Sequence, residues 1–404
     1  MAYLPLANLL QHKLRSVLSA LGIGIGICML ITLSGLSRGS LYEVADRWEA
    51  VHADLFAYPD IWEGSVSSLS GVGLPDRYAH LIAREHRDIV SSVVPVFLWQ
   101  VRLAGQGQLA AGVDPWHFAA ISGGRKPIQG RIFDPDSGFS GWMERTLLGP
   151  PSDDGGPLDI GADDLGAADH NGMEVVVDSR LATAADIQLG QKVQMAGHDF
   201  TVVGIVPAGG LSRVYLPRRT AQFLFGSGDI TKSTLLFIKL HDGVDQNMAS
   251  RAIARAGVDV VQIRQFRQML TSQFAIMFVY VDAVNAVAIV IAFLFIMVTL
   301  YTIVLQRTRD IAILKTSGAS GAFIVRQIVA ESLLLTLAGT AMGIVMSLAA
   351  DVLIEAMFPL LTVRIGVRWI LTGLAVAAAG AMASAAYPAW RATRIDMVKA
   401  LNWE

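Results

Sequence analysis

The stretch LQRTRDIAILKTSGASG, residues 305–321, decides how the rest of the chain is organised. It is polar, and it lies between two apolar runs, 283–305 and 332–350, that contain no charged residue. A short charged segment between two such runs is typical of a tight loop at one face of a membrane. Apolar residues interleave with its charges, and Ile311 and Leu314 fall on one helical face. The stretch predicts a short amphipathic helix that a soluble partner can bind, or a basic loop that only fixes the topology.

The composition of the whole chain indicates a membrane protein. Hydrophobic residues make up 53% of the 404 residues and charged residues 16%, and the mean hydropathy is positive, which is unusual for a wholly soluble chain. The net charge of -2 gives no electrostatic reason to expect binding to nucleic acid. The single cysteine, Cys28, excludes a disulfide within the chain and a cysteine metal site.

The N-terminal region contains the first predicted membrane span. Residues 1–15 place leucines at helical spacing beside basic residues, which predicts an amphipathic helix on the cytoplasmic membrane surface. Residues 16–37 carry no charge, and a helix of this length extends about 33 Å, enough to cross a bilayer core. A cleaved signal peptide is the alternative, but the run is long for one and ends without a small-x-small cleavage site. We therefore expect an uncleaved anchor.

From residue 39 to residue 272 the composition becomes that of a folded soluble domain. Strand and helix patterns are mixed along it, which predicts a compact α+β domain. We expect Pro95 to break an extended region and Asp178 or Ser179 to cap a helix. Residues 134–172 are rich in Gly, Pro and Asp, and they predict a solvated insertion rather than a calcium-binding loop.

Three further apolar runs follow this domain, and basic residues predict their orientation. Lysines and arginines gather before the first span, between the second and third, and after the fourth, whereas the remaining loop has no net excess. The positive-inside rule then places both termini in the cytoplasm and the large domain outside, in a bacterial inner (plasma) membrane. The predicted segments are an amphipathic helix at 1–15, spans at 16–38, 273–305, 328–350 and 369–390, the outer domain at 39–272, a cytoplasmic loop at 306–327, a periplasmic loop at 351–368 and a cytoplasmic tail at 391–404.

Two GxxxG pairs indicate close packing between the membrane helices. They are Gly22 with Gly26 in the first span and Gly339 with Gly343 in the third. Glu331, near the start of the third span, is predicted to be structural rather than part of a proton relay.

No catalytic or cofactor-binding motif is evident in the sequence. It contains no GxxxxGK[ST] phosphate loop and no HExxH pair. We therefore predict no catalytic, cofactor-binding or metal-binding residue in this chain.

Four segments together resemble FtsX/MacB-type (type VII) ABC transporter permeases. Three of them are ANLLQHKLRSVLSALGIGIGI at 7–27, LQRTRDIAILKTSGAS at 305–320 and YPAWRATRIDMVKALNWE at 387–404. The fourth, SRLATAADIQLGQKVQMAGHDFTVVGIV at 179–206, resembles the MacB-like periplasmic core domain.

The resemblance implies an α-helical membrane protein with four transmembrane helices and a large extracytoplasmic α+β domain inserted between the first two. It also implies a second permease copy or a paralogue, and a separate cytoplasmic nucleotide-binding ATPase that binds ATP and Mg. The loop between the second and third spans is then a coupling helix, and the long second helix moves the outer domain, an action called mechanotransmission. The coupling residues implied in this sequence are Arg309, Asp310, Ile311, Leu314 and Lys315.

The implied function is that of a permease subunit, not itself an enzyme. It exports or extracts a hydrophobic or amphipathic substrate such as a lipoprotein, lipid, peptide or drug. Two alternatives stay open: a complex that transports nothing and regulates a periplasmic hydrolase, and a sensor that signals through a partner. Further partners implied are a periplasmic adaptor, a lipoprotein or hydrolase, and membrane lipids, with no nucleic acid.

Overall fold

The protein divides into two compact units, one formed by residues 1–40 and 275–404 and the other by residues 41–274. We call them the membrane unit and the α+β domain. The amphipathic helix predicted at 1–15, the insertion at 134–172 and the tail at 391–404 lie mostly outside the described residues. The computed structural model describes residues 13–59, 73–103, 105–134, 173–226, 231–254, 258–306 and 308–393.

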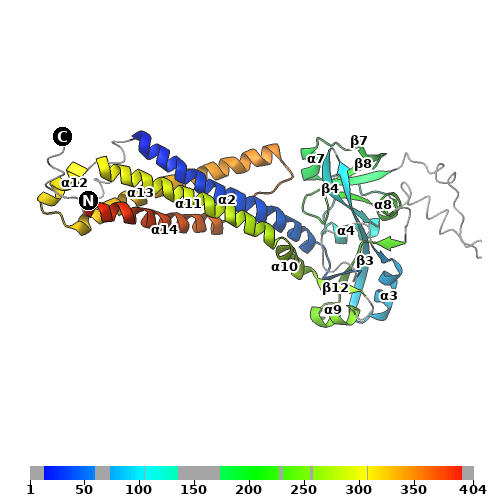
Figure 1. Ribbon diagram of the computed structural model, residues 1–404. Helices are drawn as coiled ribbons and strands as arrows, with labels where there is room; N and C mark the ends of the chain where they lie inside the picture. Colours follow the sequence, from blue (N-terminus) through cyan, green and yellow to red (C-terminus); the bar gives the residue numbers. More distant parts are fainter. Residues whose placement is uncertain are drawn as a thin grey trace, which may run out of the picture. The chain divides into compact units, whose positions relative to one another are not determined.

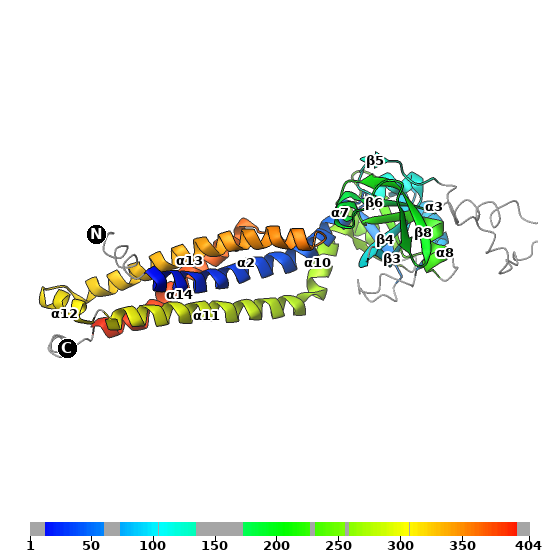
Figure 2. The same cartoon turned by 90° about the horizontal axis from the view of Figure 1, so that it is seen from above.

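Four described helices are long and apolar enough to cross a membrane. They run lengthwise along one another in Figures 1 and 2. The α+β domain is inserted between the first and the second, which confirms the predicted fold class. The helices are α2 (Lys13–Glu49, whose last residues belong to the α+β domain), α11 (Ala275–Gln306), α13 (Gly321–Met357) and α14 (Val367–Thr393), with the short α12 (Thr308–Thr316) between α11 and α13.

Two helices extend well beyond the predicted segments. α13 begins seven residues before the span predicted at 328–350, because Ser320 caps its N-terminus and accepts a hydrogen bond from the Phe323 N–H at 3.2 Å. The loop predicted at 306–327 therefore contains α12 and the first turns of α13. α2 continues past residue 38 to Glu49, where its side chains become part of the α+β domain.

The α+β domain is built on one large mixed sheet. Within the described residues its strand order is β12-β1-β11-β3-β4-β9-β6-β8-β5, with β7 paired to β8, and β2 pairs with β10 separately. The strands are β1 (Leu55–Tyr58), β2 (Leu74–Pro75), β3 (Val90–Leu103), β4 (Gln106–Val113), β5 (Gln129–Gly130), β6 (Glu174–Asp178), β7 (Lys192–Met195), β8 (His198–Val206), β9 (Val214–Pro217), β10 (Lys232–Ser233), β11 (Leu235–Leu240) and β12 (Asp259–Gln262).

The short helices of this domain connect the strands and cover the sheet. Those used below are α3, which follows β2, and α9 and α10, which precede and follow β12. The helices are α3 (Arg77–Glu85), η3 (Pro115–His117), α4 (Phe118–Ile121), α7 (Ser179–Ala184), α8 (Arg218–Phe225), α9 (Gln246–Ala254) and α10 (Ile263–Gln273).

The long strand β3 joins the two halves of the sheet. Its first half pairs with β11 and its second half, from Phe97 onward, pairs with β4. The expectation that Pro95 breaks this region is wrong, because the strand is continuous through it and Pro95 lies opposite Leu236. Proline is tolerated there because β4 does not yet flank β3 at that point. The predicted cap is confirmed at Asp178, whose Oδ1 accepts from the Leu181 N–H at 2.7 Å at the start of α7.

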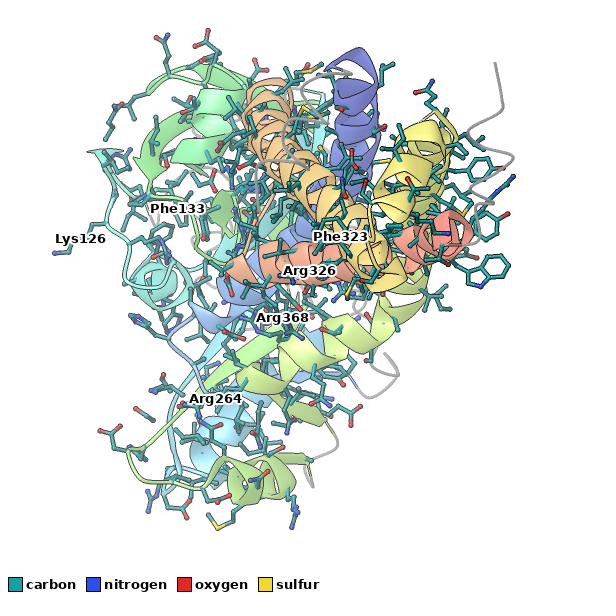
Figure 3. The ribbon with its side chains drawn as sticks, turned by 90° about the vertical axis from the view of Figure 1, so that its left-hand side faces the viewer. Lys126, Phe133, Arg264, Phe323, Arg326 and Arg368 are labelled. Atoms are coloured by element: carbon teal, nitrogen blue, oxygen red, sulfur yellow. The ribbon has the colours of Figure 1, made fainter. Side chains whose placement is uncertain are left out.

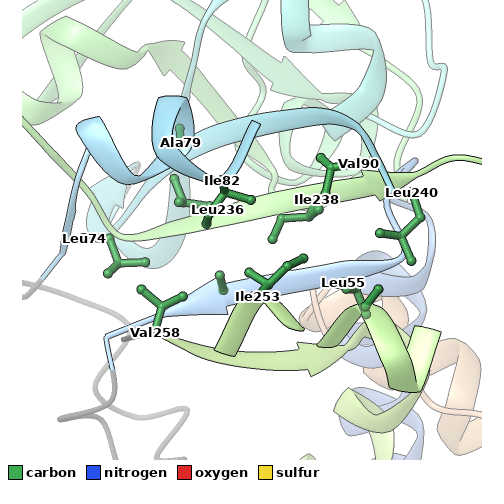
Figure 4. Close-up of a cluster of buried hydrophobic side chains, with 12 residues drawn as sticks. Leu55, Leu74, Ala79, Ile82, Val90, Leu236, Ile238, Leu240, Ile253 and Val258 are labelled. Atoms are coloured by element: carbon green, nitrogen blue, oxygen red, sulfur yellow. The ribbon is translucent and has the colours of Figure 1, made fainter. Parts of the chain in front are cut away.

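Alternation along β1 and β11 gives this half of the sheet two different faces. Leu55 and Ala57 of β1 pack with Ile82 of α3 and Ile253 of α9 in an aliphatic core, which Figure 4 shows. Phe56, between them in sequence, points to the opposite face. That face is covered by aromatic side chains from the end of α2 and from α10. The end of α2 is therefore part of the core of the domain, because its Trp48 packs on Phe56.

Candidate coupling site

α12 is anchored to the ends of the neighbouring membrane helices. Ala312 is fully buried, and Ile311 is partly buried against a cluster of Val304, Ile324, Ile328, Ala389 and Ala392 from α11, α13 and α14. The Lys315 ammonium donates a hydrogen bond to the Thr393 carbonyl at 2.7 Å, at the last residue of α14. This hydrogen bond links α12 directly to α14. Two of the predicted coupling residues, Ile311 and Lys315, thus hold α12 in place.

The opposite surface of α12 exposes apolar residues. Ile313 is 47% exposed and Leu314 is 37% exposed. Phe323 and Arg326, in the first turns of α13, are also exposed and are labelled in Figure 3. The spacing of the sequence pointed to Ile311 rather than Ile313, because it could not tell which side of the helix the bundle covers.

The remaining two predicted coupling residues are Arg309 and Asp310. Both belong to α12. Their side chains are outside the part of the chain that the structure describes.

The four predicted packing glycines lie at helix contacts. A Cβ at Gly22 or Gly26 would lie 3.1 Å from the Phe295 ring or 3.0 Å from Ala292, both on α11. A Cβ at Gly339 would lie 2.7 Å from Cβ of Ile23 on α2. Gly22 and Gly26 of α2 therefore face α11, whereas Gly339 and Gly343 of α13 face α2.

α2 and α13 also meet closely at Gly24, a glycine that lies outside the two GxxxG pairs of the sequence. A Cβ at Gly24 would lie 3.2 Å from the Gly339 carbonyl oxygen, and a Cβ at Gly343 would lie 2.7 Å from the Gly24 carbonyl oxygen. The run GIGIG at 22–26 could have predicted this contact, because its glycines lie on two faces of the helix instead of one.

Polar side chains form hydrogen bonds between α2 and α11. Ser19 on α2 and Thr299 on α11 are 2.5 Å apart, and the Asn285 amide on α11 donates to the Ser34 hydroxyl on α2 at 2.9 Å. Glu331, predicted to be structural, is buried on the inner side of α13. The Ser19–Thr299 and Asn285–Ser34 hydrogen bonds fix how α2 and α11 pack along their length.

In the α+β domain, α10 is clamped to the end of α2. The Arg267 guanidinium donates to both carboxylate oxygens of Glu49, at 3.0 and 2.9 Å, and to Asp46 at 2.6 Å. The Phe266 ring stacks on Trp48, with 4.0 Å between the ring centroids. These carboxylates hold the pKa of Arg267 above its ordinary value, because they favour its charged form. We call these residues the Arg267 clamp. It joins the end of α2 to α10, and the chain continues from α10 into α11.

Replacing Arg267 with alanine is expected to loosen α10 with little effect on overall stability. The ion pairs are about one third exposed, and exposed pairs contribute about 0.5–1 kcal/mol each. Losing about 1–2 kcal/mol locally speeds amide exchange in residues 263–273 roughly 5- to 30-fold. Hydrogen exchange of the full chain measures this. Arg264→Ala is the matched control, because Arg264 lies on the exposed side of α10, and equal exchange in the two variants would disprove the clamp.

A buried ion network also ties α2 to the second half of the sheet. Glu43 accepts hydrogen bonds from Arg47 at 2.8 Å and from Arg213 at 3.0 Å, and Arg47 lies 3.5 Å from Asp178. Burial raises the pKa of Asp178, although the two arginines oppose that shift. Burial raises the pKa of the neighbouring Tyr215 to about 12, so its phenol stays protonated and hydrogen-bonded to the Ser212 N–H.

A second ionic cluster, around Asp114, predicts that the stability of the fold depends on pH. Asp114 accepts a hydrogen bond from Arg218 at 2.9 Å. Burial alone raises the pKa of Asp114, but the interactions with His117 and Arg218 outweigh it, so the pKa lies below its ordinary value of 3.8. A carboxyl whose pKa is lowered on folding stabilises the fold above its unfolded pKa, and that contribution disappears as the pH falls through the folded pKa.

We therefore expect Asp114→Asn to lower the free energy of unfolding by about 2–3 kcal/mol at neutral pH, because buried Arg218 loses a charged hydrogen-bond partner. The difference from the unmutated protein is expected to be constant above about pH 5 and to shrink below about pH 3.8. Urea unfolding of the full chain in detergent at several pH values measures it. Asp199→Asn, at an exposed position on β8, is the control, and a pH-independent loss in Asp114→Asn would refute the prediction.

Comparisons with known proteins agree with this architecture. Residues 16–256 match the family described as MacB-like periplasmic core domain, and residues 283–397 match the family described as FtsX-like permease C-terminal. Similar proteins include the macrolide export ATP-binding/permease proteins MacB of Chlorobium luteolum (24% identity, covering 98% of this chain and 59% of the relative) and MacB 1/2 of Paracoccus denitrificans (27% identity, 99% and 58%). The chain spans little more than half the length of these relatives.

Among solved structures, the periplasmic region of MacB from Actinobacillus actinomycetemcomitans matches with a TM-score of 0.37 and 14% identity, over 55% of this chain and 94% of that one. The two family matches together cover the first membrane helix, most of the α+β domain, and most of the three membrane helices that follow. This chain therefore belongs to the FtsX/MacB-type family of ABC transporter permeases.

Proposed function

We propose that this chain is the membrane subunit of an ATP-binding cassette complex. In this proposal a separate cytoplasmic ATPase docks on α12 and drives movement of the α+β domain, and the complex exports or extracts a hydrophobic or amphipathic substrate. One observation carries the proposal: Ile311 and Lys315 anchor α12 to its neighbouring helices, while Ile313 and Leu314 stay exposed. An exposed apolar pair on a fixed helix is suited to a protein partner.

The packing of α12 supports a mechanical role. Its buried side touches a cluster drawn from α11, α13 and α14, so a force applied to α12 acts on all three helices. α11 is a continuous helix of 32 residues, and the chain passes from it through Phe274 into α10, which the Arg267 clamp fixes to α2. In this proposal a movement of α11 relative to α2 pulls on the α+β domain, because the chain runs directly from α11 into α10.

ATP hydrolysis is assigned to a partner in this proposal. The relatives are named ATP-binding/permease proteins, whereas this sequence contains no GxxxxGK[ST] motif. ATP and Mg would then bind to the partner ATPase. A second permease copy or paralogue would provide the other half of the complex, and a periplasmic adaptor, lipoprotein or hydrolase is a further partner to test.

The orientation is part of the same proposal. Lys315 and Arg326 lie at the α12 end of the membrane unit, and the positive-inside rule assigns that end to the cytoplasm. Both termini would then be cytoplasmic and the α+β domain periplasmic, in a bacterial inner membrane.

Affinity purification of the chain from its native membrane in mild detergent tests the proposal. We expect a P-loop ATPase to co-purify, and the reconstituted complex to hydrolyse ATP faster when its lipid, lipoprotein or peptide substrate is present. Recovery of an ATPase together with a hydrolase, and no response to any substrate, would instead support the regulatory complex. Absence of any ATPase would contradict the assignment of α12.

A further inference from the structure

An arginine and three aromatic residues form a cluster where α11 and α14 approach the α12 end of the membrane unit. Tyr387, Trp390 and Arg391 lie on one face of α14 because they are spaced by three and four residues. The Tyr387 ring stacks on Tyr301 of α11, with 6.1 Å between the centroids, and lies 6.3 Å from the Trp390 ring. We call these four residues the Arg391 cluster.

Among the residues that the structure describes, no carboxylate forms an ion pair with Arg391. Its Nη1 donates a hydrogen bond to the Tyr301 hydroxyl, and its guanidinium carbon lies 4.8 Å from the Tyr301 ring centroid. Among the described residues these are its contacts, so most of its five N–H donors remain available to an anion. A guanidinium binds a phosphate group through two parallel hydrogen bonds when such donors are free.

The surface beside Arg391 is apolar and accessible. Tyr387 is 50% exposed and Trp390 is 51% exposed. Further from the helix ends, the exposed residues on the same sides of α11 and α14 are Val298, three residues before Tyr301, and Ala383, four residues before Tyr387. The surface therefore changes from cationic at the helix ends to aromatic and then aliphatic.

We propose that the Arg391 cluster binds an anionic phospholipid. Arg391 and the Tyr301 hydroxyl bind the lipid phosphate, the rings of Tyr387 and Trp390 pack against the glycerol region, and the acyl chains lie along the apolar side chains beyond them. Basic side chains at a membrane surface attract anionic headgroups, and tyrosine and tryptophan favour the same interfacial layer. A soluble phosphate would use the guanidinium but would leave the adjoining apolar surface without a partner.

Native mass spectrometry of the full chain in detergent, titrated with single lipids, tests the site. We expect phosphatidylglycerol to bind at least about fivefold more tightly than phosphatidylcholine, with the preference falling as salt rises. Arg391→Gln is expected to lower the phosphatidylglycerol affinity about fivefold, and Arg391→Lys to lower it less, because lysine keeps the charge but not the paired donors of the guanidinium. Arg368→Gln is the matched control, because Arg368 is an exposed arginine at the opposite end of α14 and is labelled in Figure 3.

Three outcomes would overturn the proposal. They are equal binding of the two lipids by the unmutated chain, an equal loss of affinity in Arg391→Gln and Arg368→Gln, and full displacement of phosphatidylglycerol by inorganic phosphate, which would assign the site to a soluble anion. Circular dichroism of each variant verifies that it is folded. The measurement needs no ATPase, so its result is independent of the function proposed for α12.

Discussion

Replacing Ile313 and Leu314 together with aspartate is expected to abolish binding of the partner ATPase while the membrane unit still folds. Both side chains are exposed in the free chain, so the substitutions bury no charge within it. In a complex each would lose apolar burial of about 1.5–3 kcal/mol and place a carboxylate against a desolvated surface. We therefore expect affinity to fall by at least about 100-fold, since each 1.4 kcal/mol is a tenfold change.

Co-purification of the ATPase and its turnover in the reconstituted complex measure this effect. Leu361→Asp is a matched control, because Leu361 is also exposed and lies in the loop between α13 and α14. Ile311→Asp answers a different question, because Ile311 packs on the buried cluster and its loss would release α12 itself. Unchanged ATPase recovery with Ile313→Asp and Leu314→Asp would show that the partner binds elsewhere.

Replacing Gly343 with leucine is expected to force α2 and α13 apart. A Cβ at this position would lie 2.7 Å from the Gly24 carbonyl oxygen and 2.9 Å from Cβ of Ile27. The first of these neighbours is backbone, which cannot turn away as a side-chain end can. Overpacking in a core costs about 1–3 kcal/mol, and a clash with backbone is expected at or above the upper end of that range.

Thermal unfolding of the detergent-solubilised chain measures this loss of stability. Gly343→Ala is expected to fall between the unmutated protein and Gly343→Leu, since it adds the Cβ alone. Ala349→Leu is the control, because Ala349 is exposed on the same helix. Equal melting temperatures for Gly343→Leu and Ala349→Leu would mean that α2 and α13 do not need this close contact.

Much of the architecture was predictable from local sequence pattern. The uncharged runs identified the four membrane helices, because crossing a bilayer requires about 20 consecutive apolar residues whatever their neighbours are. The Asp178 cap was likewise predictable, because a cap depends only on residues within three positions along the chain. The charged stretch at 305–321 also indicated a helix, which the structure describes as α12.

Tertiary structure decided which of these residues face each other. Periodicity placed Ile311 on the presented face of α12, but the ends of three other helices cover it and leave Ile313 exposed. The Gly24 contact depends on where α13 crosses α2, and the Arg267 clamp joins residues more than 200 positions apart. The sequence alone determined the elements and their order, because those depend on neighbours along the chain. The contacting faces depend on packing between distant segments, which only the folded chain specifies.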